Sequence, residues 1–153
     1  MTKPYIGVVG ASKISSEFEK IAFEVGFEIA KQNGILVCGG LTGVMEAACR
    51  GAKQAGGTTI GILPGFDRSE ANPYVDIAIT TGLHEARNLI IIRTSDVLIA
   101  IAKGLGTLSE IAFALKTGKP VIGIGTWDNE ITLVKVKTAE EAVRKAWENL
   151  TKH

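Results

Sequence analysis

The chain has 153 residues, of which 46% are hydrophobic and 22% charged, a composition typical of a soluble globular protein with room for a sizeable core. Its formal net charge is +1 and no stripe of lysine or arginine stands out, which argues against duplex nucleic acid as a partner. The longest apolar runs, such as Leu89–Ile92 and Val97–Ala102, are far too short to cross a bilayer, so we expect no membrane partner.

Apolar runs and helical periods alternate along the chain. Short apolar runs predict buried strands, recurrence every three to four residues predicts helices, and the polar stretch around Pro73 predicts a loop. In chain order the sequence predicts strand 5–9, helix 16–32, strand 35–38, helix 44–55, strand 58–63, loop 66–74, strand 76–81, helix 84–94, strand 96–102, helix 107–116, strand 120–124, edge strand 131–136 and helix 138–150.

Strands that are apolar throughout and alternate with helices indicate a parallel sheet that is covered on both faces. We therefore expect an α/β fold, a single doubly wound Rossmann-like domain over residues 1–153, with a mostly parallel sheet of about seven strands. In such sheets ligands bind beyond the carboxyl ends of the strands, at the switch in strand order.

Two glycine-rich turns, Gly39–Gly43 and Gly104–Thr107, each connect a predicted strand to a predicted helix. This arrangement leaves backbone N–H groups at the N-terminus of a helix, where the dipole is positive, and so favours anions. Because both turns follow strands, both can reach the ligand-binding edge of the sheet, and we predict a phosphorylated ligand there. The alternative, that the glycines only permit tight turns, remains open.

Neither the turn after the first strand nor the Gly39–Gly43 turn carries a known nucleotide fingerprint. Gly10 and Ser12 follow the first strand without the G-x-G-x-x-G spacing of dinucleotide-binding proteins. A P-loop would need a Gly-Lys-Ser/Thr run after the Gly39–Gly43 turn, and the sequence has none there. The pattern therefore indicates the class of ligand more clearly than the reaction.

Polar residues near the second turn are candidates for chemistry. Glu110 follows Thr107 by three residues, so it either caps the predicted helix or faces the ligand as a general acid or base beside Arg87. Lys103 precedes the turn, where it either points to solvent or adds a positive charge to the phosphate site. His84 is a further acid–base candidate, although a lone histidine is more often a hydrogen-bonding partner.

Cys38 and Cys49 show neither the spacing of metal ligands nor a disulfide framework, and we interpret them as packing residues. No metal site is predicted. The N-terminal residues run directly into a strand pattern without a signal-peptide pattern, so we expect a reduced, cytoplasmic protein.

Three segments together resemble the Lonely Guy (LOG) superfamily, many members of which carry the label "possible lysine decarboxylase". These are Gly39–Met45, the pair Arg87-Asn88 and Gly104–Glu110, and the resemblance runs from residue 5 to about residue 124. The pair Arg87-Asn88 and the run Ser109–Ala112 look closest to the branch that contains the molybdenum cofactor carrier proteins.

The resemblance implies hydrolysis of the N-glycosidic bond of a nucleoside 5′-monophosphate, with Arg87 and Glu110 as the catalytic pair. Physically, bond cleavage develops oxocarbenium charge on the sugar, and a nearby carboxylate stabilises that charge or activates water. The implied substrate and phosphate-binding residues are Gly10, Ser12, Gly39, Gly40, Thr42, Gly43, Met45, Asn88, Lys103, Gly104, Gly106 and Thr107.

The sequence departs from the family motif beside this proposed site. Ala102-Lys103-Gly104 stands where the family has Pro-Gly-Gly, and Asn88 stands where it has lysine. The alternative is therefore a non-catalytic carrier that binds a phosphorylated ligand, either a nucleotide or a molybdopterin-like group. No cofactor is required in either case, and nothing indicates a pyridoxal phosphate site. Relatives form homodimers or higher oligomers, and the apolar run Leu89–Ile92 fits a helix that is buried by a partner as well as by the sheet.

Overall fold

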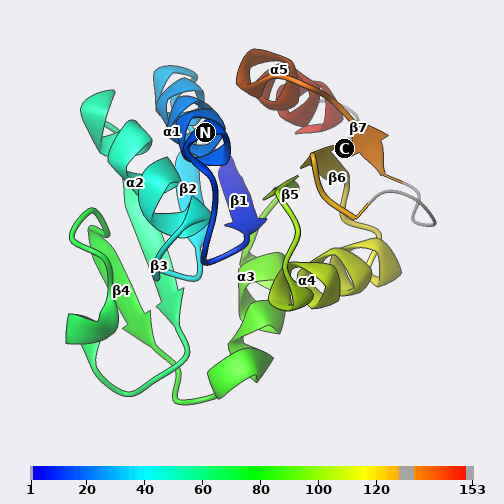
Figure 1. Ribbon diagram of the computed structural model, residues 1–153. Coiled ribbons are helices and arrows are strands. Elements are labelled where there is room, and N and C mark those ends of the chain that lie inside the picture. The colour runs from blue at the N-terminus through cyan, green and yellow to red at the C-terminus, as the bar shows by residue number, and fades with distance from the viewer. Residues whose placement is uncertain (1, 128–132, 151–153) are drawn as a thin grey trace.

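The computed structural model describes residues 2–127 and 133–150 (Figure 1). Strands and helices alternate, with two short 3-10 helices, η1 and η2, in the middle of the chain. In chain order the elements are β1 (Tyr5–Gly10), α1 (Ser16–Lys31), β2 (Ile35–Cys38), α2 (Val44–Gln54), β3 (Thr59–Leu63), η1 (Arg68–Glu70), β4 (Ile77–Thr80), η2 (His84–Arg87), α3 (Asn88–Thr94), β5 (Val97–Ile101), α4 (Leu105–Lys116), β6 (Val121–Ile124), β7 (Val134–Lys135) and α5 (Ala139–Leu150).

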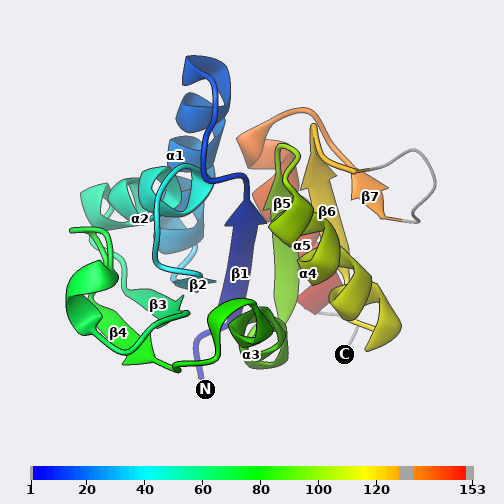
Figure 2. The ribbon, with the colours of Figure 1, turned by 60° about the horizontal axis from the view of Figure 1, so that its bottom comes forward.

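All seven strands run parallel in one sheet, in the order β4-β3-β2-β1-β5-β6-β7. The chain builds outward from β1 to β4, then crosses back to β5 on the other side of β1. The switch in strand order therefore lies between β1 and β5, where Val8 pairs with Ile99. Figure 2 shows the carboxyl ends of β1 and β6 directed toward the same edge. This is the edge at which sheets of this kind bind ligands.

Helices cover both faces of the sheet, as the sequence predicts. Figure 1 shows α1, α2 and α5 on one face and α3 and α4 on the other. Side chains alternate along each strand, so Val8 faces the α1–α2–α5 layer whereas the neighbouring Val9 packs in the core of the α3–α4 layer. The strands in the middle of the sheet are apolar throughout because both of their faces are buried.

Helices α1 and α2 touch through two glycines. A Cβ at Gly26 would lie 1.9 Å from the carbonyl oxygen of Ala48, and a Cβ at Gly51 would lie 1.9 Å from that of Phe23. Only residues without a side chain allow the two backbones this approach. The contact fixes α2, and with it the turn Gly39–Gly43 that leads into this helix.

The predicted strands and helices are confirmed in type, and the differences concern their bounds, together with the short 3-10 helix η1 (Arg68–Glu70), which lies inside the predicted loop 66–74. The predicted helix 84–94 is divided into η2 and α3, and α4 begins at Leu105 rather than at Thr107. The last strand is only Val134–Lys135, and residues 131–132 of the predicted strand lie outside the described residues. Within the part of the chain that the structure describes, every helix is too short or too polar to cross a membrane.

Candidate functional site

A cavity of about 410 Å³ opens at the carboxyl edge of the sheet, beside the switch between β1 and β5. Four separate stretches of the chain form its wall, and each follows a strand or begins a helix. They are residues 9–13, then Gly39, Leu41 and Met45, then Arg87 and Asn88, and finally residues 103–107 with Glu110.

Most of the residues that the sequence marks as a site line this cavity. The three exceptions are Gly40, Thr42 and Gly43, which lie outside its lining. Those that line it are Gly10, Ser12, Gly39, Met45, Arg87, Asn88, Lys103, Gly104, Gly106, Thr107 and Glu110.

Two backbone amides in and directly after the first glycine turn already donate hydrogen bonds within the protein. The Gly40 amide donates to Cys38 Sγ at 3.3 Å, and the Val44 amide donates to the carbonyl of Ala11 at 3.1 Å. Gly43 has φ +69°, and a Cβ there would lie 2.4 Å from the same Ala11 carbonyl oxygen. The glycines at 40 and 43 therefore have a structural role, which agrees with the alternative that they permit a tight turn.

Gly39 differs from the other glycines of its turn because it makes room for a cavity residue. A Cβ at Gly39 would lie 2.7 Å from Arg87 Nη2 and 2.8 Å from Met45 Sδ. The guanidinium of Arg87 therefore packs against the backbone at the end of β2.

The second glycine turn places helix amides without intrahelical partners in the wall of the cavity. Gly104 is the N-cap of α4, and the first helical bond runs from the Leu108 amide to the Gly104 carbonyl at 3.0 Å. The preceding amides, those of residues 105–107, lie in the first turn, which has no intrahelical acceptors. Residues 105–107 all line the cavity. This is the geometry that favours an anion.

Lys103 is held at the rim of the cavity by an aromatic ring. Its Nζ lies 5.5 Å from the centre of the Trp127 ring, and Trp127 Nε1 donates to the Gly104 carbonyl at 2.9 Å. The preceding residue, Ala102, has φ +64° and is buried. A left-handed alanine is strained, and such strain clusters at functional sites.

Arg87 and Glu110 are the buried charged groups of the cavity wall. Arg87 is 9% exposed, and its Nη1 donates to Asn88 Oδ1. Asn88 Nδ2 in turn donates to Ser109 Oγ at 3.4 Å. Burial lowers the pKa of Arg87, and the nearby Glu110 partly offsets this effect.

Glu110 is 6% exposed, and this burial raises its pKa to about 8 despite the opposing charge of Arg87. Its carboxyl group is therefore mostly protonated at neutral pH. Glu110 does not cap α4, because this helix begins at Leu105 and its N-cap, Gly104, has no side-chain capping bond. The capping role considered for Glu110 from the sequence is wrong.

The other candidates from the sequence lie away from the cavity. His84 is exposed, outside the cavity lining, and packs edge-on against Phe66 with ring centres 6.3 Å apart. Cys38 and Cys49 are free and buried, with sulfur atoms 3.5 Å apart. Their contact lowers the pKa of Cys38 and, together with burial, raises that of Cys49. Among the described residues, His, Cys, Asp and Glu side chains form no group of three that could hold a metal.

Sequence reasoning missed Asn72, which holds the first glycine turn in place. Its backbone amide donates to the Gly40 carbonyl at 2.9 Å, and its side-chain Nδ2 donates to the Leu41 carbonyl at 2.8 Å. Leu41 lines the cavity, so Asn72 positions part of the wall from behind. The pair Asn72-Pro73, which favours a turn, was the available signal.

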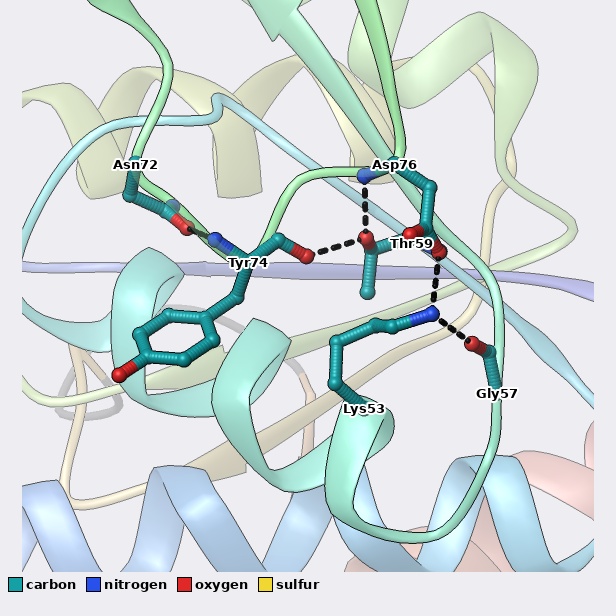
Figure 3. Close-up of polar contacts among 6 residues, drawn as sticks. All are labelled: Lys53, Gly57, Thr59, Asn72, Tyr74 and Asp76. Atoms are coloured by element: carbon teal, nitrogen blue, oxygen red, sulfur yellow. Dashed lines mark hydrogen bonds and ion pairs between the residues drawn. The ribbon is translucent and has the colours of Figure 1, made fainter.

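A chain of polar contacts extends from Asn72 to the surface (Figure 3). Asn72 Oδ1 accepts from the Tyr74 amide at 3.0 Å, and Thr59 Oγ1 donates to the Tyr74 carbonyl at 2.6 Å. Asp76 Oδ2 then accepts from the Thr59 amide at 3.0 Å and pairs with Lys53 Nζ at 2.9 Å. This chain ties the segment after η1 to β3 and α2.

A family model and a relative of known activity both match this chain. A model of the SLOG cluster4 family matches residues 3–150. The chain is 32% identical, over 126 residues, to the cytokinin riboside 5′-monophosphate phosphoribohydrolase of Mycobacterium tuberculosis, which covers 76% of this chain and 67% of that protein.

Two solved structures are similar over nearly their whole length. The molybdenum cofactor binding protein of Rippkaea orientalis is 41% identical with a TM-score of 0.91, covering 97% of this chain and 98% of that one. The molybdenum cofactor carrier protein of Chlamydomonas reinhardtii is 40% identical with a TM-score of 0.89, covering 97% and 99%. These structures confirm the predicted Rossmann-like fold.

Proposed function

The chain belongs to the SLOG cluster4 family, as its resemblance to LOG proteins predicts, and from this membership we propose that it binds and carries a small phosphorylated ligand of the molybdenum cofactor type. One observation carries the proposal. The open amides of α4, the cation Lys103 and the buried Arg87 all line a single cavity of about 410 Å³. The likeness to a molybdenum cofactor binding protein and to a carrier protein supports the choice of ligand.

The chemistry of the wall suits a phosphate monoester. The phosphate accepts from the amides of residues 105–107, where the helix dipole favours negative charge. Lys103 adds a formal positive charge beside this turn, and its contact with Trp127 limits where that charge lies. This placement supports the predicted roles of Gly104, Gly106 and Thr107 in binding a phosphate.

Thermal unfolding with added ligand tests the proposal. The probes are molybdenum cofactor released from a purified molybdoenzyme, AMP and inorganic phosphate. A ligand at about 100 times its dissociation constant stabilises the native state by about 2.7 kcal/mol, and we expect this shift with the cofactor and no turnover of it. Lys103→Met should weaken binding, whereas Lys116→Met, at the exposed far end of the same helix, should not. A cofactor that leaves the unfolding temperature unchanged would contradict the proposal.

A second candidate function is hydrolysis of a nucleoside 5′-monophosphate, which the buried acid Glu110 favours. A protonated Glu110 would donate its proton to the departing base while water adds to the anomeric carbon and returns a proton to the carboxylate. The relative from Mycobacterium tuberculosis supports this reading. Free base released from a panel of nucleotides, and lost in Glu110→Gln, is the expected result. A wild-type protein that releases no base from any of them excludes it.

We also propose that the protein forms a homodimer or higher oligomer through the edge of the sheet at β4. Ile77 and Ile79 are 48% and 43% exposed, and Leu83 and Phe66 nearby are 49% and 80% exposed. Ile77 pairs in register with Ile60, so this exposed surface continues the apolar face that α3 and α4 cover elsewhere. Sedimentation of the wild type against Ile77→Lys tests the assembly, and a wild-type monomer would contradict it.

The two free cysteines suit the reducing cytoplasm, where we propose that the protein works.

A further inference from the structure

The guanidinium of Arg87 is buried in the cavity wall without an anionic partner. Arg87 is 9% exposed, and within the described chain it makes no ion pair and its Nε has no hydrogen-bond partner. The acceptor of its Nη1 is the neutral amide of Asn88. A buried charge is costly unless it is paired, so this arrangement favours a counter-ion from outside the protein.

The titratable groups around Arg87 do not supply that counter-ion. They are Glu110, Cys38 and Glu85. Burial keeps Glu110 mostly protonated near neutral pH, because its pKa is about 8. The sulfur of Cys38 contacts Cys49 Sγ and accepts from the Gly40 amide rather than from Arg87, and Glu85 is exposed on the surface.

The charges of the cavity wall point the same way. The wall holds the cations Lys13, Arg87 and Lys103 against the single carboxyl group of Glu110. A neighbouring hollow of about 360 Å³, which shares Ser12 and Lys13 with the cavity, has a balanced wall. Its cations are Lys13 and Arg50, and its acids are Glu19 and Glu46. The excess of positive charge therefore belongs to the cavity itself.

We propose that the ligand carries, besides its phosphate, a second compact anionic group, a carboxylate or an oxyanion, that pairs with Arg87. This inference rests on the proposed phosphate site and adds the other end of the ligand. The phosphate lies at the first turn of α4 beside Lys103. The second anion pairs with the guanidinium of Arg87 where it lines the cavity, and the protonated Glu110 donates a hydrogen bond to it. A nucleoside monophosphate, whose base is neutral, leaves Arg87 without its counter-ion.

Two phosphorylated sugars that differ at one carbon test this inference. Ribose 5-phosphate has a neutral end, whereas 5-phosphoribonate has a carboxylate in its place. Because hydrogen bonds to charged groups contribute more than neutral ones, we expect the wild-type protein to bind the acid at least about tenfold more tightly at pH 7 by calorimetry. Equal affinity for the two sugars overturns the second-anion proposal. Binding of neither sugar instead contradicts the phosphate site, so the two failures are distinguishable.

Variants separate the two anion positions. Arg87→Gln should erase the preference for the acid, whereas Lys103→Met should weaken both sugars by the same factor. Arg93→Gln, on the exposed side of α3, is the matched control and should keep the wild-type ratio. A preference that survives in Arg87→Gln overturns the assignment of the second anion to Arg87.

A second variant guards against an Arg87→Gln protein that fails to fold. In Gly39→Ala the three atoms nearest to the new Cβ belong to two flexible side chains, those of Arg87 and Met45, so we expect the fold to be kept while the guanidinium is displaced. We expect the preference for the acid to fall in this variant. An unchanged ratio in a folded Gly39→Ala protein counts against the proposal.

Discussion

Trp127 Nε1 donates to the carbonyl of Gly104 at 2.9 Å, so a residue from the loop after β6 fixes the point at which α4 begins. Trp127→Phe keeps most of the ring and removes the bond. We expect the free energy of unfolding to fall by about 1 kcal/mol and ligand affinity to fall as well, because the open amides follow Gly104 directly. Denaturant unfolding and a ligand titration measure both. Trp147→Phe, in α5 and outside the cavity lining, should leave affinity unchanged.

The protonation of Glu110 makes stability depend on pH. Its pKa is raised from 4.5 to about 8 in the folded protein, so between these values the unfolded chain releases a proton that the folded chain keeps. The contribution of Glu110 to the stability of the ligand-free protein should therefore be greatest below about pH 4.5. It should fall as the pH rises to about 8.

Glu110→Gln removes this titration. Denaturant unfolding from pH 5 to 9 should show a flatter profile than in the wild type, with a difference on the order of a few kcal/mol across the range. Glu24→Gln, on the exposed side of α1, should keep the wild-type slope. Parallel profiles for Glu110→Gln and the wild type would mean that Glu110 is ionised in the folded protein.

Asn72 should contribute far more to the free energy of unfolding than the Lys53–Asp76 ion pair at the other end of its chain of polar contacts. Asn72→Ala leaves the Leu41 carbonyl and the Tyr74 amide without their partner, and we expect a loss of about 1–3 kcal/mol in the free energy of unfolding. Lys53→Met removes an ion pair whose side chains are 37% and 34% exposed, and such pairs contribute about 0–1 kcal/mol. Similar losses in the two variants would contradict this ranking.

The glycines of the α1–α2 contact should not tolerate a methyl group. Gly51→Ala puts a Cβ 1.9 Å from a backbone carbonyl oxygen, which cannot move aside as a side chain can, and we expect a loss of about 1–3 kcal/mol or more. A Cβ at Gly106, also helical, meets nothing within 4 Å, so Gly106→Ala should be neutral or stabilising by up to about 1 kcal/mol. Thermal unfolding of both variants decides between these outcomes.

Local patterns in the sequence were sufficient for the fold and for much of the cavity wall. The strands and helices follow from periodicity, and the parallel sheet brings Gly39 and Gly104 to one edge because both follow strands. Asn72 and Trp127 could not be found in this way. Their partners, Leu41 and Gly104, lie 31 and 23 residues away, and these contacts depend on the order of the strands.

The protonation of Glu110 was equally hidden in the sequence. A carboxylate six residues into a helix is exposed or buried according to how the helix is rotated on the sheet, which helical periodicity alone does not specify at a polar position. The roles of Arg87 and Glu110, as a catalytic pair or as ligand contacts, stay predictions. At the first glycine turn, Gly40 and Gly43 have a structural role that the pattern did not separate from ligand binding, and their predicted part in binding stays a prediction.

The contact between α1 and α2 determines which side of the cavity can yield to an incoming guest. Backbone meets backbone at Gly26 and Gly51, so the β2–α2 side of the entrance is anchored to a rigid pair of helices. On the opposite side, Leu105 is 81% exposed and belongs to neither core, so its side chain can move without disturbing the packing. Entry of a bulky guest should therefore proceed by movement of the Leu105 side chain over an otherwise unchanged scaffold.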